Sequence, residues 1–185
     1  MLTVTPTAIP AVKILEPRRH GDARGYFSET WTRRRMQENG LDLDFVQDNE
    51  SLSSVPGAVR GLHFQSHPNA QDKLIRVLAG RILDVAVDLR RSSPTYGQHV
   101  AVELSAENGR QLLVPIGFAH GLCTLEPNTV VAYKVTAYYS PADDLGVAWD
   151  DPDLAIAWPV AKDAALLSPK DAKQPAFRDL PAYFE

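Results

Sequence analysis

The sequence has only one cysteine and no long apolar run. The single thiol, Cys123, cannot form a disulfide within the chain, and this usage is typical of a reducing compartment. No apolar segment approaches the ~20 residues of a membrane helix, and no basic segment followed by an apolar stretch opens the sequence. We therefore expect a cytoplasmic protein without a membrane partner, in which Cys123 is buried and unreactive.

The chain also lacks a strong excess of charge and a dinucleotide-binding motif. Its net charge is -4 at pH 7, which gives no indication of nucleic acid as a partner. No GxGxxG pattern occurs, so no nicotinamide cofactor is predicted. The 185 residues, 44% of them hydrophobic, are typical of one domain, residues 1–185, that is long enough to build a core.

Strand-forming segments dominate the middle of the chain. LIRVL and RILDVAVDL lie on either side of Gly80 and predict a hairpin or two neighbouring strands. HVAVELS and RQLLVP are separated by Ala-Glu-Asn-Gly, and Asn-Gly between such runs is a strong hairpin signal. TVVAYKVTAYYS alternates with the period of a strand. Many short strands separated by turns predict an all-β sandwich or barrel, of which the double-sheet jelly roll is one form.

Helical signals are few. The segment TWTRRRMQEN, residues 30–39, ends at Gly40 and predicts one short helix. Ser168 and Pro169 are typical of a cap that opens a short helix or turn. We expect the tail after Pro152, rich in proline and alanine, to wrap over the barrel. We expect roughly the first 25 residues to form strands that pair with another subunit, because no better local partner is evident.

The segment from Gly57 to Gly80 resembles the first half of the metal-binding motif of cupins. That motif runs Gly, five residues, His, any residue, His, a short gap, Glu, six residues, Gly. Gly57 and His63 keep their spacing, and so do Lys73 and Gly80. Gln65, however, stands in place of the second His, and Lys73 stands in place of the Glu. Zinc and iron are bound by imidazole, thiolate or carboxylate groups, and an ammonium repels a metal ion.

The second half of the motif lies in GRQLLVPIGFAH. The positions in register are Gly109, Pro115, Gly117 and His120. The chain therefore resembles a cupin double-stranded jelly-roll barrel, all-β with a few short helices, that has replaced its metal site. We predict no metal.

His63 and Lys73 carry the chemistry that this replacement indicates. A pocket-facing imidazole can accept a proton at neutral pH. Lys73 shares one side of its strand with Ile75 and Val77 by two-residue alternation. A lysine that faces inward needs an anionic partner, and a developing enolate oxygen is such a partner. His120 is either a hydrogen-bond partner of the substrate or a satisfied core residue, and the sequence leaves both open.

Tyrosines follow in AYKVTAYYS. Tyr138 is typical of a core residue, whereas Tyr133 and Tyr139 share one face if the strand stays regular. A phenol in a pocket can act as an acid, and its ring can stack on a base. Four further charged residues are candidates for binding phosphates, sugar hydroxyls or a base: Arg24, Glu29, Arg60 and Lys170.

From about residue 12 to about residue 172, the chain resembles the dTDP-4-dehydrorhamnose 3,5-epimerases. The matching segments are DARGYFSETW, FVQDNESLS, VRGLHFQ, AQDKLIRVLAGRILDVAVDLR, LLVPIGFAHGL, YKVTAYYSP, WDDPDLAIAWP and LSPKDA. The resemblance implies a homodimer without a metal or organic cofactor, acting on dTDP-4-dehydro-6-deoxy-D-glucose. It implies inversion at C3 and C5 to give dTDP-4-dehydro-L-rhamnose.

The resemblance also implies roles for single residues. His63 would be the base, paired with Asp171, and Tyr133 would be the acid on the opposite face of the sugar. Lys73 would stabilise the enolate oxygen. Asp144 stands where the family usually has Glu, which would weaken one contact to the nucleotide or sugar. The positions implied to line the nucleotide-sugar site, with Tyr139 stacked on thymine, are Arg24, Glu29, Gln47, Asp48, Asn49, Arg60, His120, Tyr139, Asp144 and Lys170.

Three alternatives stay open at this point. The first is an epimerase that inverts only C3 or only C5 of a related sugar. The second is a cupin that binds a sugar nucleotide without catalysis, against which the set of proton-transfer residues argues. The third is a metal-dependent cupin, against which Gln65 and Lys73 argue. Fold alone does not choose among them.

Overall fold

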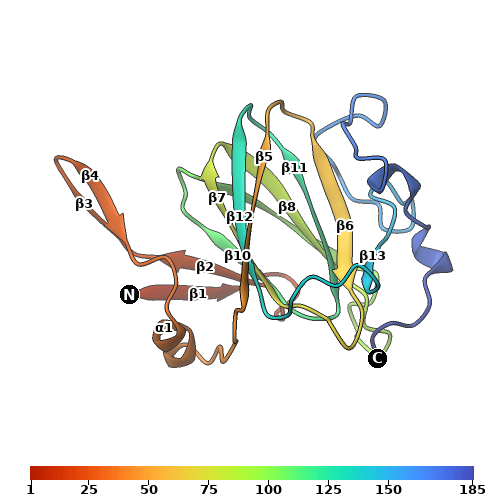
Figure 1. Ribbon diagram of the computed structural model, residues 1–185, viewed down its shortest axis with the longest axis horizontal. Helices are drawn as coiled ribbons and strands as arrows, with labels where there is room; N and C mark the ends of the chain where they lie inside the picture. The colour runs from red at the N-terminus through yellow and green to blue at the C-terminus, as the bar shows by residue number, and fades with distance from the viewer.

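Two antiparallel sheets face each other and enclose the core, in a computed structural model that describes residues 1–185 (Figure 1). The six-stranded sheet has the order β1 (Leu2–Pro6), β2 (Lys13–Pro17), β10 (Gln111–Val114), β7 (Lys73–Ala79), β12 (Thr129–Val135), β5 (Gln47–Ser53). The five-stranded sheet has the order β13 (Asp144–Gly146), β6 (Val59–Gln65), β11 (Phe118–Thr124), β8 (Arg81–Asp88), β9 (His99–Ser105). The all-β jelly roll predicted from the sequence is confirmed.

The main core lies between the two sheets. Alternate residues of each strand point inward, as Ile75 and Val77 do from β7 and Ile82 and Ala86 do from β8. Ile75, Ile82 and Ala86 are completely buried, and full burial of an isoleucine contributes about 1.5–3 kcal/mol. The same alternation on β7 turns Lys73 inward, as predicted.

The two predicted hairpins do not form, which is a correction. At Gly80 the chain leaves the six-stranded sheet with β7 and enters the five-stranded sheet with β8. The turn at Asn108-Gly109 likewise carries the chain from β9 in one sheet to β10 in the other. Both sheets must cover the same core, so β7 pairs with β10 and β12, and β8 pairs with β11 and β9. The glycines turn the chain across the core instead of along one sheet.

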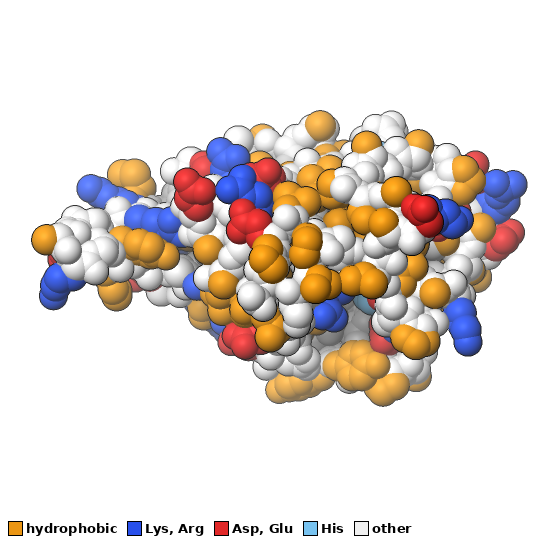
Figure 2. All heavy atoms as spheres, turned by 90° about the horizontal axis from the view of Figure 1, so that it is seen from above, with side chains coloured by type: hydrophobic (Ala, Val, Ile, Leu, Met, Phe, Trp, Pro, Cys, Tyr) orange, Lys and Arg blue, Asp and Glu red, His pale blue; other side chains and the backbone are white.

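The N-terminal strands have partners within their own chain, which the sequence did not indicate. β1 and β2 pair with each other, and β2 pairs with β10 of the same chain. Only the ribbon of β3 (Arg19–Asp22) and β4 (Gly25–Ser28) projects from the barrel (Figure 1). Hydrophobic and basic side chains lie together on this projecting end (Figure 2).

The predicted helix and the C-terminal tail form as expected. Helix α1 (Arg33–Glu38) begins after Thr32, whose hydroxyl accepts a hydrogen bond from the N–H of Arg35, and ends before Gly40, with a φ of 73°. The 3-10 turns η1 (Asp171–Lys173) and η2 (Phe177–Asp179) lie in the tail. The tail covers the outer face of the five-stranded sheet, where Leu154, Leu180 and Phe184 join one apolar cluster with Val85 and Val87. No helix is long and apolar enough to cross a membrane.

Candidate active site

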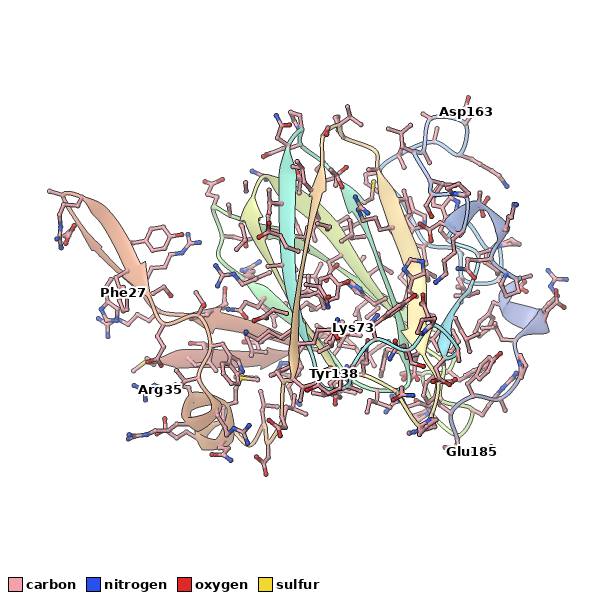
Figure 3. All side chains as sticks on the ribbon, in the orientation of Figure 1. Phe27, Arg35, Lys73, Tyr138, Asp163 and Glu185 are labelled. Carbon is pink, nitrogen blue, oxygen red and sulfur yellow. The ribbon has the colours of Figure 1, made fainter.

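One pocket of about 190 Å³ opens at the end of the barrel where β6, β7 and β12 meet the C-terminal tail. Lys73 lies inside the barrel, whereas Phe27 lies far from it on the projecting ribbon (Figure 3). The residues that line the pocket are Gln47, Asn49, His63, Phe64, Gln65, Gln71, Lys73, Tyr133, Tyr139, Asp144 and Lys170. Eight of the predicted site residues thus meet in one cavity, and most of the lining groups are polar.

His63 and Asp171 form a hydrogen-bonded pair at the wall of this pocket. The distance from His63 Nε2 to Asp171 Oδ1 is 2.5 Å. The His63 side chain is 30% exposed, whereas that of Asp171 is only 4% exposed. Asp171 therefore fixes the orientation of the imidazole from behind and leaves the ring accessible to a ligand.

The Asp171 carboxylate is itself held in place. Burial by itself would raise the pKa of Asp171, but hydrogen bonds from His63, the Ser168 hydroxyl and the Gly61 N–H outweigh it and lower the pKa. The Asp171 N–H in turn donates to the Ser168 oxygen at 3.1 Å. The carboxylate is therefore ionised at neutral pH and suited to stabilise a protonated His63.

Gly61 makes this arrangement possible on β6. Its φ is 124°, and a Cβ there would lie 2.6 Å from the Cα of Gly121 and 2.7 Å from the carbonyl oxygen of His120. The pairing of β6 with β11 shifts register at this point. Only glycine fits where the two backbones approach so closely, and this approach leaves the Gly61 N–H directed at Asp171.

Lys73 and Tyr133 place an amine and a phenol in the pocket. The Lys73 Nζ donates to the carbonyl oxygen of His63 at 3.3 Å. Burial lowers the pKa of Lys73 to about 8, although the charges of Asp144 and Asp84 partly oppose this shift. Burial also raises the pKa of Tyr133, so its phenol keeps its proton at neutral pH. The two residues lie on the neighbouring strands β7 and β12.

A second polar cluster forms the pocket mouth. The Tyr139 hydroxyl donates to Asp144 Oδ2 at 3.1 Å, and the Lys170 ammonium pairs with the same oxygen. The Tyr139 N–H donates to the side-chain oxygen of Gln47 at 3.1 Å. The shorter Asp144 side chain thus reaches both partners, and the Tyr139 ring, 57% exposed, presents a face at the pocket entrance.

The strand expected through Tyr139 ends earlier than predicted. β12 stops at Val135, so Tyr139 reaches the pocket from a loop and not through strand alternation. Tyr138 is 68% exposed, and its prediction as a core residue was wrong. Gln65 holds this loop, because its amide donates to the Tyr138 carbonyl at 3.1 Å and accepts from the Ser140 N–H at 2.8 Å.

Some predicted site residues lie outside the pocket. Asp48 points to the outer face of its sheet and pairs with Lys134 at 2.8 Å, because alternation separates it from its neighbours Gln47 and Asn49. Arg60 donates to the Ser53 hydroxyl at 3.2 Å, and its charge acts on Tyr133.

Arg24 and Glu29 lie far from the pocket of their own chain. Arg24 pairs with Asp22 at the tip of the projecting ribbon, at 2.5 Å. Glu29 lies near α1, where it pairs with Arg35 at 3.4 Å. Neither can reach a ligand in the pocket of the same chain.

His120 lies behind the pocket and not in its lining. Its Nε2 is 2.7 Å from Oδ1 of Asp84, and the two residues are 9% and 0% exposed. Asp84 was not predicted from the sequence, although a carboxylate within the apolar run RILDVAVDL is a signal of a buried, partnered charge. No group of three or more His, Cys, Asp or Glu side chains is arranged to hold a metal ion.

Comparisons with known proteins bear on this site. The family model described as dTDP-4-dehydrorhamnose 3,5-epimerase matches residues 6–179. An enzyme of that name from Sinorhizobium fredii is 53% identical over 178 residues, 96% of this chain and 91% of the relative. The crystal structure of a Bacillus anthracis dTDP-4-dehydrorhamnose 3,5-epimerase with TDP and PPi bound is similar, with a TM-score of 0.92 and 51% identity over 95% of this chain and 99% of that chain. A Legionella pneumophila dTDP-6-deoxy-D-glucose-3,5-epimerase, in complex with dTDP-4-keto-L-rhamnose, gives a TM-score of 0.93 and 45% identity over 98% of this chain and 96% of that chain.

Proposed function

Because the chain belongs to the dTDP-4-dehydrorhamnose 3,5-epimerase family, we propose that it inverts C3 and C5 of dTDP-4-dehydro-6-deoxy-D-glucose. The product would be dTDP-4-dehydro-L-rhamnose. The observation that carries the proposal is one pocket in which the His63–Asp171 pair, Lys73 and Tyr133 meet. The single cysteine supports a location in the reducing cytoplasm.

His63 is the proposed base. The hydrogens on C3 and C5 both lie α to the C4 carbonyl, so removal of either gives an enolate. His63 takes the proton, and the ionised Asp171 stabilises the imidazolium that forms. A positioned base of this kind contributes roughly 10²–10⁴-fold to the rate.

Lys73 and Tyr133 complete the proton transfer. The Lys73 ammonium lies within the barrel and stabilises the charge that develops on the C4 oxygen; such a donor typically contributes about 3–4 kcal/mol. Tyr133, protonated at neutral pH, returns a proton to the other face of the sugar. Reprotonation from that face inverts the carbon, and no redox step occurs.

The pocket mouth is suited to the nucleotide. The cavity of about 190 Å³ is smaller than the roughly 300–1,000 Å³ of pockets that enclose a whole ligand. The sugar would therefore occupy the cavity, and the nucleotide would extend across the mouth. Lys170 offers a cation to the diphosphate, and the exposed Tyr139 ring offers a stacking face to the base.

A homodimer is part of this proposal. The outer face of the six-stranded sheet carries a basin of about 420 Å³ and the exposed side chains of Leu52 and Leu78. The ribbon projects beyond the barrel, with Phe27 73% exposed. Arg24 and Glu29 cannot reach their own pocket, so they would serve the pocket of a second subunit. A partner that covers this sheet would bring its ribbon to that pocket.

Deuterium oxide tests the proposed reaction. The enzyme is incubated with dTDP-4-dehydro-6-deoxy-D-glucose, the product is trapped by reduction, and proton NMR locates the deuterium. We expect deuterium and inverted configuration at both C3 and C5. Exchange or inversion at one centre only would indicate a single-centre epimerase, and no exchange at all would indicate a binding protein. Elemental analysis of the same preparation tests for a metal-dependent cupin.

Tyr133→Phe tests the acid. Without the phenol, His63 still removes a proton, so we expect inversion to slow more than deuterium exchange. The ratio of the two rates is measured in wild type and variant. An equal loss of both rates would contradict the assignment of Tyr133 as the acid.

A further inference from the structure

Gln65 stands at the second His position of the cupin motif, and no step of the proposed reaction uses it. It follows His63 by two residues on β6, lines the pocket and is buried. Its amide makes three hydrogen bonds, all to backbone groups. Nε2 donates to the carbonyl oxygens of Asn69 at 2.6 Å and Tyr138 at 3.1 Å, and Oε1 accepts from the Ser140 N–H at 2.8 Å. Both protons of this amide are therefore used, and none is left for a ligand.

Two of these bonds hold the backbone on either side of Tyr139. The Tyr138 carbonyl belongs to the peptide group before the Cα of Tyr139, and the Ser140 N–H belongs to the peptide group after it. The N–H of Tyr139 itself donates to the side-chain oxygen of Gln47 at 3.1 Å. Because peptide groups are planar, holding both of them fixes the two backbone dihedral angles of the residue between them. The direction in which the Tyr139 side chain leaves the backbone is thereby fixed.

Gln65 also lies opposite the residue that holds the Tyr139 hydroxyl. In the pairing of β13 with β6, Asp144 is the cross-strand partner of Gln65. Oδ2 of Asp144 accepts the hydrogen bond from the Tyr139 hydroxyl at 3.1 Å. The backbone of Tyr139 and its hydroxyl are therefore held from one position on β6, and the ring between them stays exposed at the pocket.

Other hydrogen bonds join the two loops at this end of the barrel, residues 66–72 and 136–143. The Asn69 amide donates to Asp143 Oδ2 at 2.8 Å, and the Gln71 amide donates to the Ala137 carbonyl at 2.7 Å. These bonds keep the loops together but do not reach the peptide groups that flank Tyr139. Loss of the Gln65 amide would therefore free Tyr139 without separating the loops.

We propose that Gln65 is a positioning residue for nucleotide recognition, because it holds the Tyr139 ring in the orientation in which the ring stacks on the base. This inference rests on the proposed function, in which Tyr139 offers a stacking face. A ring that is already held loses little conformational freedom when the ligand binds, whereas a free ring must be ordered by the ligand. Gln65 would thus determine how tightly the nucleotide binds, and it would leave the proton transfers of His63 and Tyr133 unchanged.

Titration calorimetry with dTDP tests this role in wild type, Gln65→Met, Tyr139→Ala and the double variant. Met keeps the length of the side chain but makes none of the three hydrogen bonds. We expect Gln65→Met to weaken dTDP binding about 10-fold. In the Tyr139→Ala background the same substitution should have almost no further effect, because it acts through the Tyr139 ring. With dTDP-4-dehydro-6-deoxy-D-glucose, KM of Gln65→Met should rise by a similar factor while kcat stays close to that of wild type.

Asn69→Ala is the matched control. It removes the hydrogen bond to Asp143 between the same two loops, but it keeps the Asn69 carbonyl and the bonds of Gln65 on both sides of Tyr139. We expect dTDP affinity and KM close to those of wild type. An equal loss in Asn69→Ala and Gln65→Met would overturn the proposal, and so would an unchanged affinity in Gln65→Met. Losses that add in the double variant with Tyr139→Ala would also overturn it.

Gln65→Glu secures the test if Gln65→Met does not fold. Its carboxylate still accepts from the Ser140 N–H but repels the carbonyl oxygens of Asn69 and Tyr138, so the same loss of affinity and the same dependence on Tyr139 are expected. Coupled losses in a protein that shows no epimerisation would reject the proposed reaction and leave the role of Gln65 intact. Epimerisation together with additive losses would do the reverse, and a wild type that binds no dTDP would reject both.

Discussion

His63 depends on residues that lie far from it in the sequence. Asp171 is 108 residues away, and Asp171 is held by Ser168 and Gly61. His63 and Lys73 could be predicted, because each stands at a ligand position of a recognisable motif and faces inward. No local pattern joins His63 to Asp171, so family resemblance alone linked them, and Ser168 was not singled out as a support of that carboxylate.

His63→Ala tests the base directly. Loss of the imidazole should abolish deuterium incorporation at C3 and C5 together and lower kcat by roughly 10²–10⁴-fold or more. His99→Ala is the control, because His99 lies partly buried on β9 and outside the pocket. The measurement is exchange followed by NMR in deuterium oxide. Full-rate exchange in His63→Ala would exclude His63 as the base.

The pH profile tests Lys73. Because burial lowers its pKa from 10.5 to about 8, kcat/KM should fall as the pH rises through about 8, where the ammonium loses its proton. Lys73→Arg keeps a cation that does not titrate in this range. We expect kcat/KM of this variant to be lower than that of wild type but not to fall as the pH rises through 8. Between pH 8 and 10.5, Lys73 is mostly deprotonated in the folded chain but still protonated in the unfolded chain. Lys73 therefore makes the free energy of unfolding rise with pH in that window. If kcat/KM of Lys73→Arg fell at the same pH as that of wild type, a group other than Lys73 would cause the fall.

At the scale of elements, the strands follow from local sequence but their partners do not. Alternating apolar runs predict β7, β8, β9 and β12 nearly as they form. The turns at Gly80 and Asn108-Gly109 carry a hairpin signal, yet each connects the two sheets. Which strands pair depends on how both sheets cover one core, and a signal a few residues long contains no such information. Tyr138 was misplaced because β12 ends at Val135 and the loop beyond it bonds to Gln65, which alternation along the strand does not indicate.

Asp88→Asn tests how the end of β8 is held. Burial by itself would raise the pKa of Asp88, but hydrogen bonds from Arg90, Ser93 and Thr95 outweigh it and lower the pKa to about 2. Loss of this charge should cost about 2 kcal/mol of unfolding free energy at pH 7. Since the native pKa lies below the ordinary 3.8, the contribution is complete well above pH 4 and is lost as pH falls through 2.

Urea unfolding at two pH values measures this effect. The difference between wild type and Asp88→Asn should narrow to about half near pH 3. Asp163→Asn is the control, because Asp163 lies on an exposed loop at the edge of the molecule (Figure 3). A difference that stays constant from pH 7 to pH 3 would mean that packing, and not ionisation, is what Asp88 contributes.

At the scale of the whole molecule, the ribbon of β3 and β4 extends away from the barrel (Figure 1). Arg19 anchors its base, because its guanidinium donates to the carbonyl oxygens of Ala106 and Glu107 at 2.6 and 2.5 Å and lies 4.3 Å from the Tyr26 ring centroid. An anchored base with exposed aromatic side chains, Tyr26 and Phe27, is typical of an element that docks elsewhere. From the sequence, strands of this region were expected to pair with another subunit, whereas β1 and β2 pair within the chain and β1 lies at the edge of its sheet.

Mixing two inactive variants tests whether the ribbon serves a partner. Arg24→Ala has an intact pocket and a defective ribbon, whereas His63→Ala has the reverse. In a mixed dimer the pocket of the first receives the ribbon of the second, so activity should exceed that of either variant alone. Size-exclusion chromatography with light scattering checks that dimers form. No gain on mixing, with dimers present, would mean that Arg24 does not act across subunits.

The carboxylate that pairs with His63 is made late in the synthesis of the chain. All strands of both sheets end by residue 146, so they leave the ribosome before Ser168 and Asp171 do. A chain released before residue 168 would carry every strand of the barrel, His63, Lys73 and Tyr133, but its imidazole would lack a carboxylate. A chain that ends between residues 146 and 168 would therefore carry His63 without its carboxylate partner, and it would also lack Leu180 and Phe184 of the apolar cluster that covers the five-stranded sheet.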